Sequence, residues 1–292
     1  MKPAPFDYYA PTSLEEALDT LAQLGYDGKV LAGGQSLVAA MNFRMAQPAA
    51  LVDLNNVSEL FYIKPAADGG LLIGTMTRSS TVEHDPLIEK KAPLIHEAMP
   101  NVAHPQIRNR GTFGGAVAHA DPAGQAPGLV LALQAKLLVK SKNAERWVAA
   151  EDFFMGPFSP AVEPGEMLVE IALPPLPPRT GTCYQHVARQ KGATSLVGCS
   201  TVVTLDEKGA CKAATMVLSA VGETPLAVPQ AAQLLIGQKP SEEGIRAAAE
   251  QAAKEIDPGS DIHATAEYRR HLAKVLVQHT LKVAFARAAQ GG

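Results

Sequence analysis

Residues 31–36 read LAGGQS and residues 111–122 read GTFGGAVAHADP, so the chain twice places a Gly-Gly pair after a segment that we expect to be a strand. A glycine in an ordered element costs roughly 0.5–1 kcal/mol relative to alanine, because it loses more conformational freedom on folding. Each pair therefore indicates either a very tight turn or a place where something approaches the backbone closely.

The residues around the first pair predict a strand followed by a helix. KVLA (29–32) is a short apolar strand, and LVAAMNFRM (37–45) has helix-forming composition. Upstream, PTSLEEALDTLAQLG (11–25) predicts a helix that begins after the N-cap Ser13. A glycine loop before a helix exposes unpaired N–H groups at the positive end of the helix dipole, which suits a pyrophosphate, and a plain tight turn is the alternative.

The second pair adds a hydroxyl group and lies beside polar residues. Four of the five positions 111–115 are Gly111, Thr112, Gly114 and Gly115. Two such loops could hold the pyrophosphate of a dinucleotide from both sides, although a purely structural role for the glycines stays open. The sequence has neither GxGxxG nor GxxxxGK[ST], so a Rossmann or Walker nucleotide site is not indicated.

Basic and acidic residues flank the second pair. His104, Arg108 and Arg110 precede it and could contact phosphate or acidic residues of a partner, or simply be solvated. His119 and Asp121 follow it and could form a general base, but we favour a capping role or a polar cofactor contact for Asp121.

The sequence shows no catalytic or metal-binding constellation of its own. No serine has the G-x-S-x-G frame, and no HExxH motif occurs. Cys183, Cys199 and Cys211 lie 16 and 12 positions apart, so no CxxC pair exists, and we expect three buried thiols. We therefore expect no catalytic residue and no metal on this chain, and any redox chemistry would need a bound organic cofactor.

Composition excludes several classes of partner. The formal net charge is −3 and there is no long Lys/Arg run, which argues against a nucleic-acid or acidic-membrane surface. No apolar run reaches the ~18–20 residues of a membrane span, and the N-terminus has no signal-peptide pattern. We expect a cytoplasmic protein without an integral membrane segment.

The rest of the chain predicts two domains that meet near residue 178. Mixed α and β elements fill the first part, with strands expected at 50–57, 71–77 and 166–174, a helix at 91–102, and a helix followed by a strand within 127–140. PPLPPRTG (174–181) predicts a boundary, because proline lacks an N–H and disfavours helix before it. Beyond it we expect antiparallel strands within 182–222, and helices at 241–256 and about 264–288. On the last helix we expect one apolar face formed by Tyr268, Leu272, Val275 and Leu276.

Six segments together resemble one family. They are FDYYAPTSLEEAL, KVLAGGQSLVAAMNFRMAQP, VDLNNV, HPQIRNRGTFGGAVAHADPAG, EPGEMLVEIALP and AEYRRHLAKVL. The family is the medium, FAD-binding subunit of the bacterial molybdenum hydroxylases, which include carbon monoxide, nicotine and xanthine dehydrogenases. The resemblance implies an α+β fold: an FAD-binding domain of the vanillyl-alcohol-oxidase (PCMH) type at 1–177, with subdomains at about 1–57 and 58–177. A C-terminal domain of antiparallel sheet and helices would follow at 178–292.

The resemblance also implies cofactor-binding residues. In the family, the first loop and the strand before it contact the FAD pyrophosphate. The matching residues of this chain are Lys29, Val30, Leu31, Ala32, Gly33, Gly34, Gln35, Ser36 and Leu37. The residues that match the family's second cofactor-binding loop are Thr112, Phe113, Gly114, Gly115 and Ala116. The resemblance also implies that Asp121 contacts the polar part of FAD, that Leu168 lies near the adenine, and that His186 and Thr194 lie near the flavin ring. Many relatives have Asn or Ser at position 116 and an acidic residue where Gln125 stands, and they have Gly-Asp followed by an aromatic where this chain has Gly192, Ala193 and Thr194.

The function implied is electron transfer. The FAD would take electrons from two [2Fe-2S] clusters on a small subunit, after oxidation of the substrate at a molybdenum cofactor on a large subunit, and pass them to an external acceptor. The complex would be a dimer of heterotrimers, with Arg108 and Arg110 lining the cluster-facing or phosphate-facing side. Three cysteines cannot supply the eight thiolates of two such clusters. The alternatives are a self-contained flavin oxidoreductase of the same fold and a scaffold module that has lost its flavin.

Overall fold

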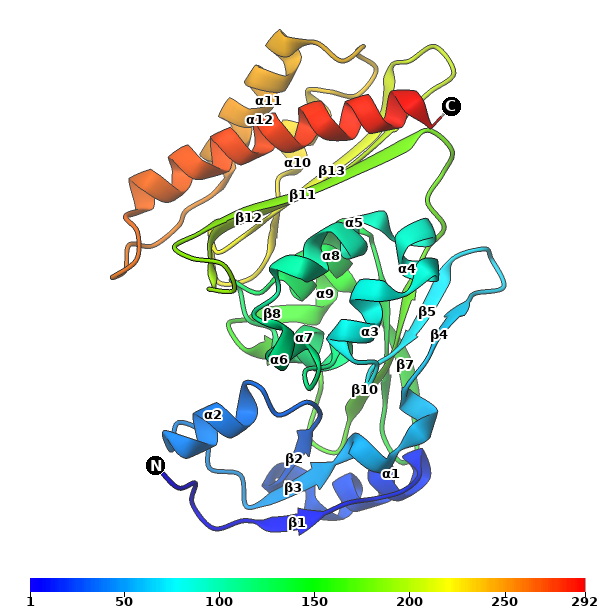
Figure 1. Ribbon diagram of the computed structural model, residues 1–292, viewed down its shortest axis with the longest axis vertical. Helices are drawn as coiled ribbons and strands as arrows, with labels where there is room; N and C mark the ends of the chain where they lie inside the picture. The colour runs from blue at the N-terminus through cyan, green and yellow to red at the C-terminus, as the bar shows by residue number, and fades with distance from the viewer. Residues whose placement is uncertain (292) are drawn as a thin grey trace.

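The computed structural model describes residues 1–291, and its first sheet is small and parallel (Figure 1). The strand order is β1-β3-β2, with bounds β1 (Asp7–Tyr9), β3 (Ala50–Asp53) and β2 (Gly28–Leu31). Helix α1 (Leu14–Leu24) packs against it through Ala17, Leu18 and Leu21. The hydroxyl of Ser13 accepts a hydrogen bond from the Glu16 N–H at 3.1 Å, so the predicted N-cap is confirmed.

The second sheet is antiparallel and larger. Its order is β4-β5-β10-β6-β7, with bounds β4 (Ile63–Pro65), β5 (Leu71–Gly74), β10 (Met167–Leu173), β6 (Lys136–Lys140) and β7 (Glu145–Ala149). The helices of this part of the chain are α3 (Ser79–His84), α4 (Pro86–Lys91), α5 (Pro93–Ala98), α6 (Pro105–Arg108), α7 (Phe113–His119), α8 (Gln125–Ala132) and α9 (Ala150–Phe153). A short ribbon of β8 (Phe154–Gly156) and β9 (Ser159–Pro160) completes it.

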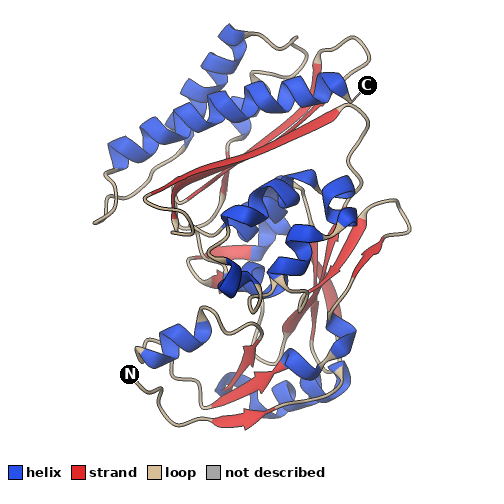
Figure 2. Ribbon diagram, viewed as in Figure 1, coloured by secondary structure: helices blue, strands red, loops and turns tan. Residues whose placement is uncertain are grey.

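The third sheet is formed by the C-terminal part of the chain. It is antiparallel, with the order β11 (Thr180–Ala188), β12 (Ser195–Leu205), β13 (Cys211–Ser219) and β14 (Leu226–Ala227). The helices that follow are α10 (Pro229–Gln233), α11 (Glu242–Glu255) and α12 (Ala266–Gln290). Figure 2 shows the three sheets at successive levels along the molecule, with helices between and above them. The elements that the sequence predicts occur in the predicted order, among further short strands and helices that it did not predict, and the α+β fold class is confirmed.

The third sheet is buried on both faces. Cys183 and Cys199 belong to the core formed with α11 and α12, whereas Tyr184 and Val217 belong to the core of the second sheet and its helices. Successive residues of a strand point to opposite faces, so one sheet serves both cores. The Glu97 carboxylate on α5 accepts hydrogen bonds from Arg287 on α12, at 2.8 and 3.0 Å, and so ties the two parts together.

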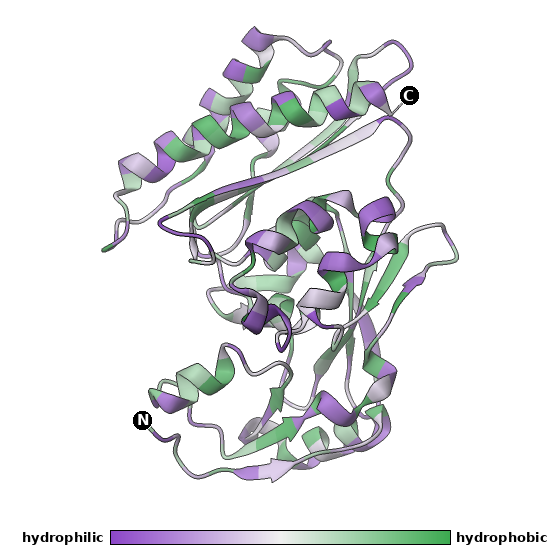
Figure 3. Ribbon diagram, in the orientation of Figure 1, coloured by the Kyte–Doolittle hydropathy of each residue, from purple (hydrophilic) through white to green (hydrophobic). Residues whose placement is uncertain are grey.

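Two expectations about local structure need correction. The strand expected at 50–57 ends at Asp53, because the Asp53 carboxylate accepts from the Asn55 N–H at 2.9 Å and starts a 3-10 turn at Leu54–Asn56. On α12, Tyr268 and Val275 are 46% and 47% exposed, so the expected apolar face is wrong in half of its members. Figure 3 shows hydrophobic and hydrophilic residues alternating along this helix. The buried stripe includes the residues 272, 273, 276 and 277.

Two further expectations concern cysteines and membrane helices. All three cysteines are buried and free, as expected, and burial raises the pKa of Cys183 to about 12 and that of Cys211 to about 11. These thiols therefore stay protonated at neutral pH. Across residues 1–291, no helix is long and apolar enough to cross a membrane.

Candidate functional site

The first glycine loop connects β2 to α2 (Leu37–Asn42), as predicted. Gly34 has φ +73°, a left-handed conformation that glycine adopts without strain. Within the described part of the chain, none of the backbone N–H groups of residues 33–37 has a hydrogen-bond acceptor. Ser36 occupies the N-cap position of α2 without a side-chain capping bond. This loop therefore presents five consecutive backbone donors.

The second glycine loop uses its donors internally. The Thr112 hydroxyl caps α7 by accepting from the Gly115 N–H at 3.0 Å. The N–H groups of Phe113 and Gly114 donate to backbone oxygens of residues 77 and 75, at 3.0 and 3.1 Å. One expectation is wrong here: the pair lies inside the first turn of α7 and follows the helical turn α6, not a strand.

The glycines allow the two loops to lie in direct contact. A Cβ atom on Gly33 would lie 2.4 Å from the Arg110 carbonyl oxygen and 2.6 Å from the Cα of Gly111. A Cβ on Gly115 would lie 2.6 Å from the Thr112 hydroxyl and 3.2 Å from the Cβ of Ala32. Any side chain at Gly33 would push the loops apart, so this glycine has a packing role that is independent of a ligand.

Gly114 fits against the second sheet in the same way. A Cβ there would lie 2.4 Å from the Cβ of Thr75, directly after β5. The Thr75 hydroxyl oxygen itself is buried without a hydrogen-bond partner among the described residues. The Thr75 hydroxyl is therefore a buried polar atom beside the second loop that no described protein group satisfies.

Two residues at this junction were missed by the sequence reasoning. Arg78 donates to the Arg110 carbonyl oxygen at 2.6 Å, and Asn55 donates to the Ala32 carbonyl oxygen at 3.0 Å. Arg78 directly follows the strand expected at 71–77, and a polar residue in that place was the signal that could have identified it. Asn55 lies inside the strand expected at 50–57, and only the observed end of β3 at Asp53 places it after a strand.

The two arginines before the second loop have different environments. Arg108 is 7% exposed and forms two hydrogen bonds to the Glu83 carboxylate, at 2.6 and 3.1 Å. It also donates to the Val102 carbonyl oxygen at 2.9 Å. The expectation that Arg108 lines a ligand or partner surface is therefore wrong. Arg110 is exposed, and within residues 1–291 it has no carboxylate within 4.0 Å.

Asp121 and His119 lie at the end of α7. The Asp121 carboxylate accepts from the Ala123 N–H at 2.9 Å, so its predicted capping role is confirmed. The His119 ring lies 5.0 Å from the ring of Phe158. Burial lowers the pKa of His119, and the negative charge of Asp121 only partly opposes this. His119 is therefore neutral at pH 7.

The remaining predicted site residues lie apart from the loop junction or in the core. Phe113 is buried in the core of the second sheet, and Leu168 is buried in β10 next to a bulge. His186 on β11 shares a hydrogen bond of 2.9 Å with the Ser195 hydroxyl, and burial lowers its pKa. The FAD contacts assigned to these residues, and to the two loops, stay predictions.

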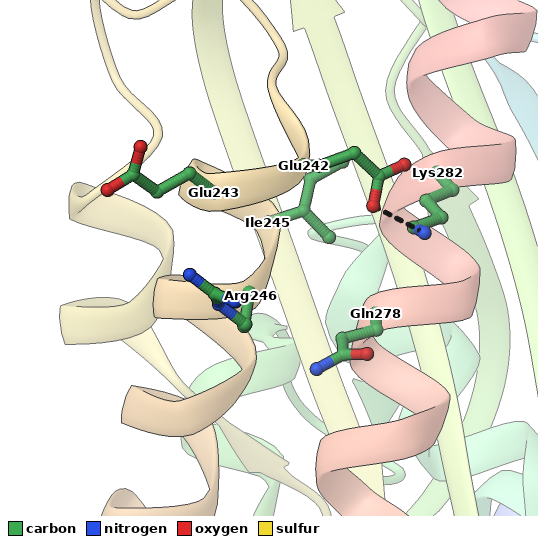
Figure 4. Close-up of a pocket in the computed structure, with 6 residues that line it drawn as sticks. All are labelled: Glu242, Glu243, Ile245, Arg246, Gln278 and Lys282. Carbon is green, nitrogen blue, oxygen red and sulfur yellow. Dashed lines mark ion pairs between the residues drawn. The ribbon is translucent and has the colours of Figure 1, made fainter.

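A separate hollow lies between α11 and α12 (Figure 4). It is lined by Glu242, Glu243, Ile245, Arg246, Gln278 and Lys282. Lys282 and Glu242 form an ion pair of 2.6 Å across it. None of these residues belongs to a glycine loop, and in the described residues no group of three His, Cys, Asp or Glu could hold a metal ion.

Comparison with known proteins gives a consistent family assignment. Residues 4–176 match the FAD binding domain in molybdopterin dehydrogenase, and residues 182–284 match the CO dehydrogenase flavoprotein C-terminal domain. The chain is 39% identical to the 6-hydroxypseudooxynicotine dehydrogenase complex subunit alpha of Paenarthrobacter nicotinovorans, over 99% of this chain and 97% of the relative. It is 35% identical to the carbon monoxide dehydrogenase medium chain of Hydrogenophaga pseudoflava, over 99% of this chain and 100% of the relative.

A solved structure of the Hydrogenophaga pseudoflava carbon monoxide dehydrogenase, which lacks the Mo-pyranopterin moiety of the molybdenum cofactor, has the same fold. Its TM-score is 0.95 at 36% identity, covering 98% of this chain and 99% of that chain. The chain therefore belongs to the family of FAD-binding flavoproteins of molybdopterin dehydrogenases. Within that family it is similar to the medium FAD subunits of multi-subunit dehydrogenases, as the resemblance predicted, and is an oxidoreductase subunit.

The residues present fit an FAD. The cofactor's pyrophosphate needs several N–H donors and a backbone that it can approach, and residues 33–37 supply five donors without a competing protein acceptor. The exposed Arg110 adds positive charge beside them. The unpaired Thr75 hydroxyl adds a further polar atom near the second loop.

Proposed function

We propose that this chain is the FAD-carrying electron-transfer subunit of a molybdenum-containing hydroxylase or dehydrogenase. The observation that carries the proposal is the pair of glycine loops in contact, one with five free backbone donors and the other rigidly bonded to the second sheet. Bound FAD would supply a carrier that exchanges electrons with both one-electron and two-electron partners. The chain's own residues would bind and orient it.

The division of roles follows from what the chain carries. Residues 33–37 would bind the pyrophosphate by backbone N–H groups. Thr112 caps α7 in the second loop, and Asp121 shapes the turn that follows α7. The three buried thiols cannot ligate two [2Fe-2S] clusters, so the clusters would lie on a small partner subunit. A large partner subunit would carry the molybdenum cofactor, in a dimer of heterotrimers. A cytoplasmic location stays a prediction.

The test uses the natively expressed complex. We expect one FAD for each copy of this chain, released by acid denaturation because the cysteines are buried, together with molybdenum and iron on co-purified chains. Rapid mixing should show flavin reduction by substrate only in the complex. An isolated chain that reduces its own FAD with an organic substrate would support the self-contained flavin oxidoreductase instead, and native complex without flavin would overturn the proposal.

A further inference from the structure

The two glycine loops approach each other closely at the Arg110 carbonyl group. The Arg110 oxygen is the atom that a Cβ on Gly33 would touch at 2.4 Å, so it lies packed against the backbone of the first loop. Its position sets the separation of the loops. A group that fixes this oxygen therefore fixes the space in which a ligand could lie between or over the loops.

The Arg78 side chain fixes this oxygen. Its Nη1 donates to the Arg110 oxygen at 2.6 Å, and its Nη2 donates to the Asn55 Oδ1 at 2.5 Å. The guanidinium group lies 5.4 Å from the ring centroid of Phe61, which limits its movement on one side. A planar guanidinium can direct two donors at two fixed acceptors, which an ammonium cannot do with the same geometry.

Asn55 extends the connection to the first loop. Its Nδ2 donates to the Ala32 carbonyl oxygen at 3.0 Å, directly before Gly33. The Asp53 carboxylate holds Asn55 by accepting from its backbone N–H at 2.9 Å, and accepts from the Tyr8 hydroxyl at 2.6 Å. Three hydrogen bonds thus connect a carbonyl of one loop to a carbonyl of the other, through Arg78 and Asn55.

The electrostatics of this junction favour an anion. Arg78 is half-buried, and burial together with the neighbouring Arg110 lowers its pKa, an effect that Asp53 only partly offsets. Neither guanidinium has a carboxylate within 4.0 Å among the described residues. Two cations that repel each other are stabilised when a pyrophosphate arrives between or beside them.

We propose that Arg78, acting through Asn55, is the positioning residue that sets the spacing of the two glycine loops for FAD. The inference rests on the proposed function, because it presupposes that these loops bind FAD. In this role Arg78 organises the loops before the cofactor arrives, so that little conformational entropy is lost on binding.

The test measures FAD binding by the full-length chain after removal of its flavin. We expect Arg78→Ala to raise the Kd for FAD roughly tenfold or more, the factor that one charge-assisted hydrogen bond contributes. Arg78→Lys should recover part of the affinity. Asn55→Ser should also weaken binding, and combining it with Arg78→Ala should add little, because both changes break one connection. Arg146→Ala, which removes an exposed ion pair with Glu166, is the matched control and should leave the Kd unchanged.

The readouts separate positioning from folding. If Arg78 only stabilised the fold, Arg78→Ala would lower the unfolding midpoint of the flavin-free chain. The Kd for FAD would then show neither partial recovery in Arg78→Lys nor non-additivity with Asn55→Ser. Wild-type Kd in Arg78→Ala, with normal binding by the unmodified chain, would overturn the inference and leave the proposed function intact. An unmodified chain that binds no FAD would overturn the proposed function itself. If Arg78→Ala is insoluble, the Asn55→Ser result decides: an unchanged Kd overturns the inference.

Discussion

The two Gly-Gly pairs look alike in sequence but have different surroundings. Around Gly33-Gly34 the backbone donors are free, whereas around Gly114-Gly115 they are bonded to Thr75 and Thr112. The first loop leads into a short, partly exposed helix, and the second lies in the first turn of a helix packed on the second sheet. A glycine pair therefore indicates close approach to the backbone. Protein atoms make that approach at both Gly33 and Gly114, and only the first loop leaves its backbone N–H groups free for a ligand.

The largest expected effect concerns the two arginines before the second loop, buried Arg108 and exposed Arg110. Arg108→Ala should lower the free energy of unfolding by about 4 kcal/mol, because it leaves the mostly buried Glu83 carboxylate without the Arg108 cation. Arg110→Ala should leave stability unchanged and weaken FAD binding. Urea unfolding followed by circular dichroism, with FAD titration, measures both. Equal loss of stability in the two variants would contradict the distinction.

Gly114→Val should lower the free energy of unfolding by about 3 kcal/mol, because its Cβ would overlap Thr75. The same urea experiment measures it. Gly259→Val is the control, since open space surrounds a Cβ at that position. If Gly114→Val folds with normal stability and loses only FAD, then the second loop is a ligand surface like the first, and the comparison fails.

Gly34→Val should cost about 1–2 kcal/mol, since φ +73° is unfavourable for a β-branched residue. Its effect on FAD should be larger, because the change displaces the row of free N–H groups. We expect loss of FAD from the purified protein while the C-terminal domain stays folded. Flavin absorbance for each protein molecule is the measurement, and wild-type flavin content would refute a role for this loop in binding.

The smallest expected effect compares the two N-caps. Thr112→Ala should lower stability by about 1 kcal/mol because it removes the bond from the Gly115 N–H, whereas Ser36→Ala should change it hardly at all. Thermal unfolding of the flavin-free chain measures the difference. A destabilised Ser36→Ala variant would show that the first loop is braced in the same way as the second.

The sequence by itself determined the family and the main helices and strands, but not the short elements between them such as α3, α4 and α6. Local signals were sufficient for this, because N-caps such as Ser13, helical periodicity and the proline-rich stretch at 174–181 act over a few residues. The sequence also led us to predict the two loops, with Thr112 as a polar residue among the glycines, as the region where a cofactor binds, and this stays a prediction. The FAD contacts of individual residues stay predictions.

Only the tertiary structure decided which protein groups the residues at the two loops contact. The burial of Arg108 depends on Glu83, 25 positions away, and the link from Arg78 to Asn55 and Arg110 joins segments 23 and 32 positions apart. Such contacts depend on how the sheets pack, which no local pattern of residues encodes. The same physical reason explains the error on α12: helical periodicity locates an apolar stripe, but the packing of the sheet against it decides which flank is buried.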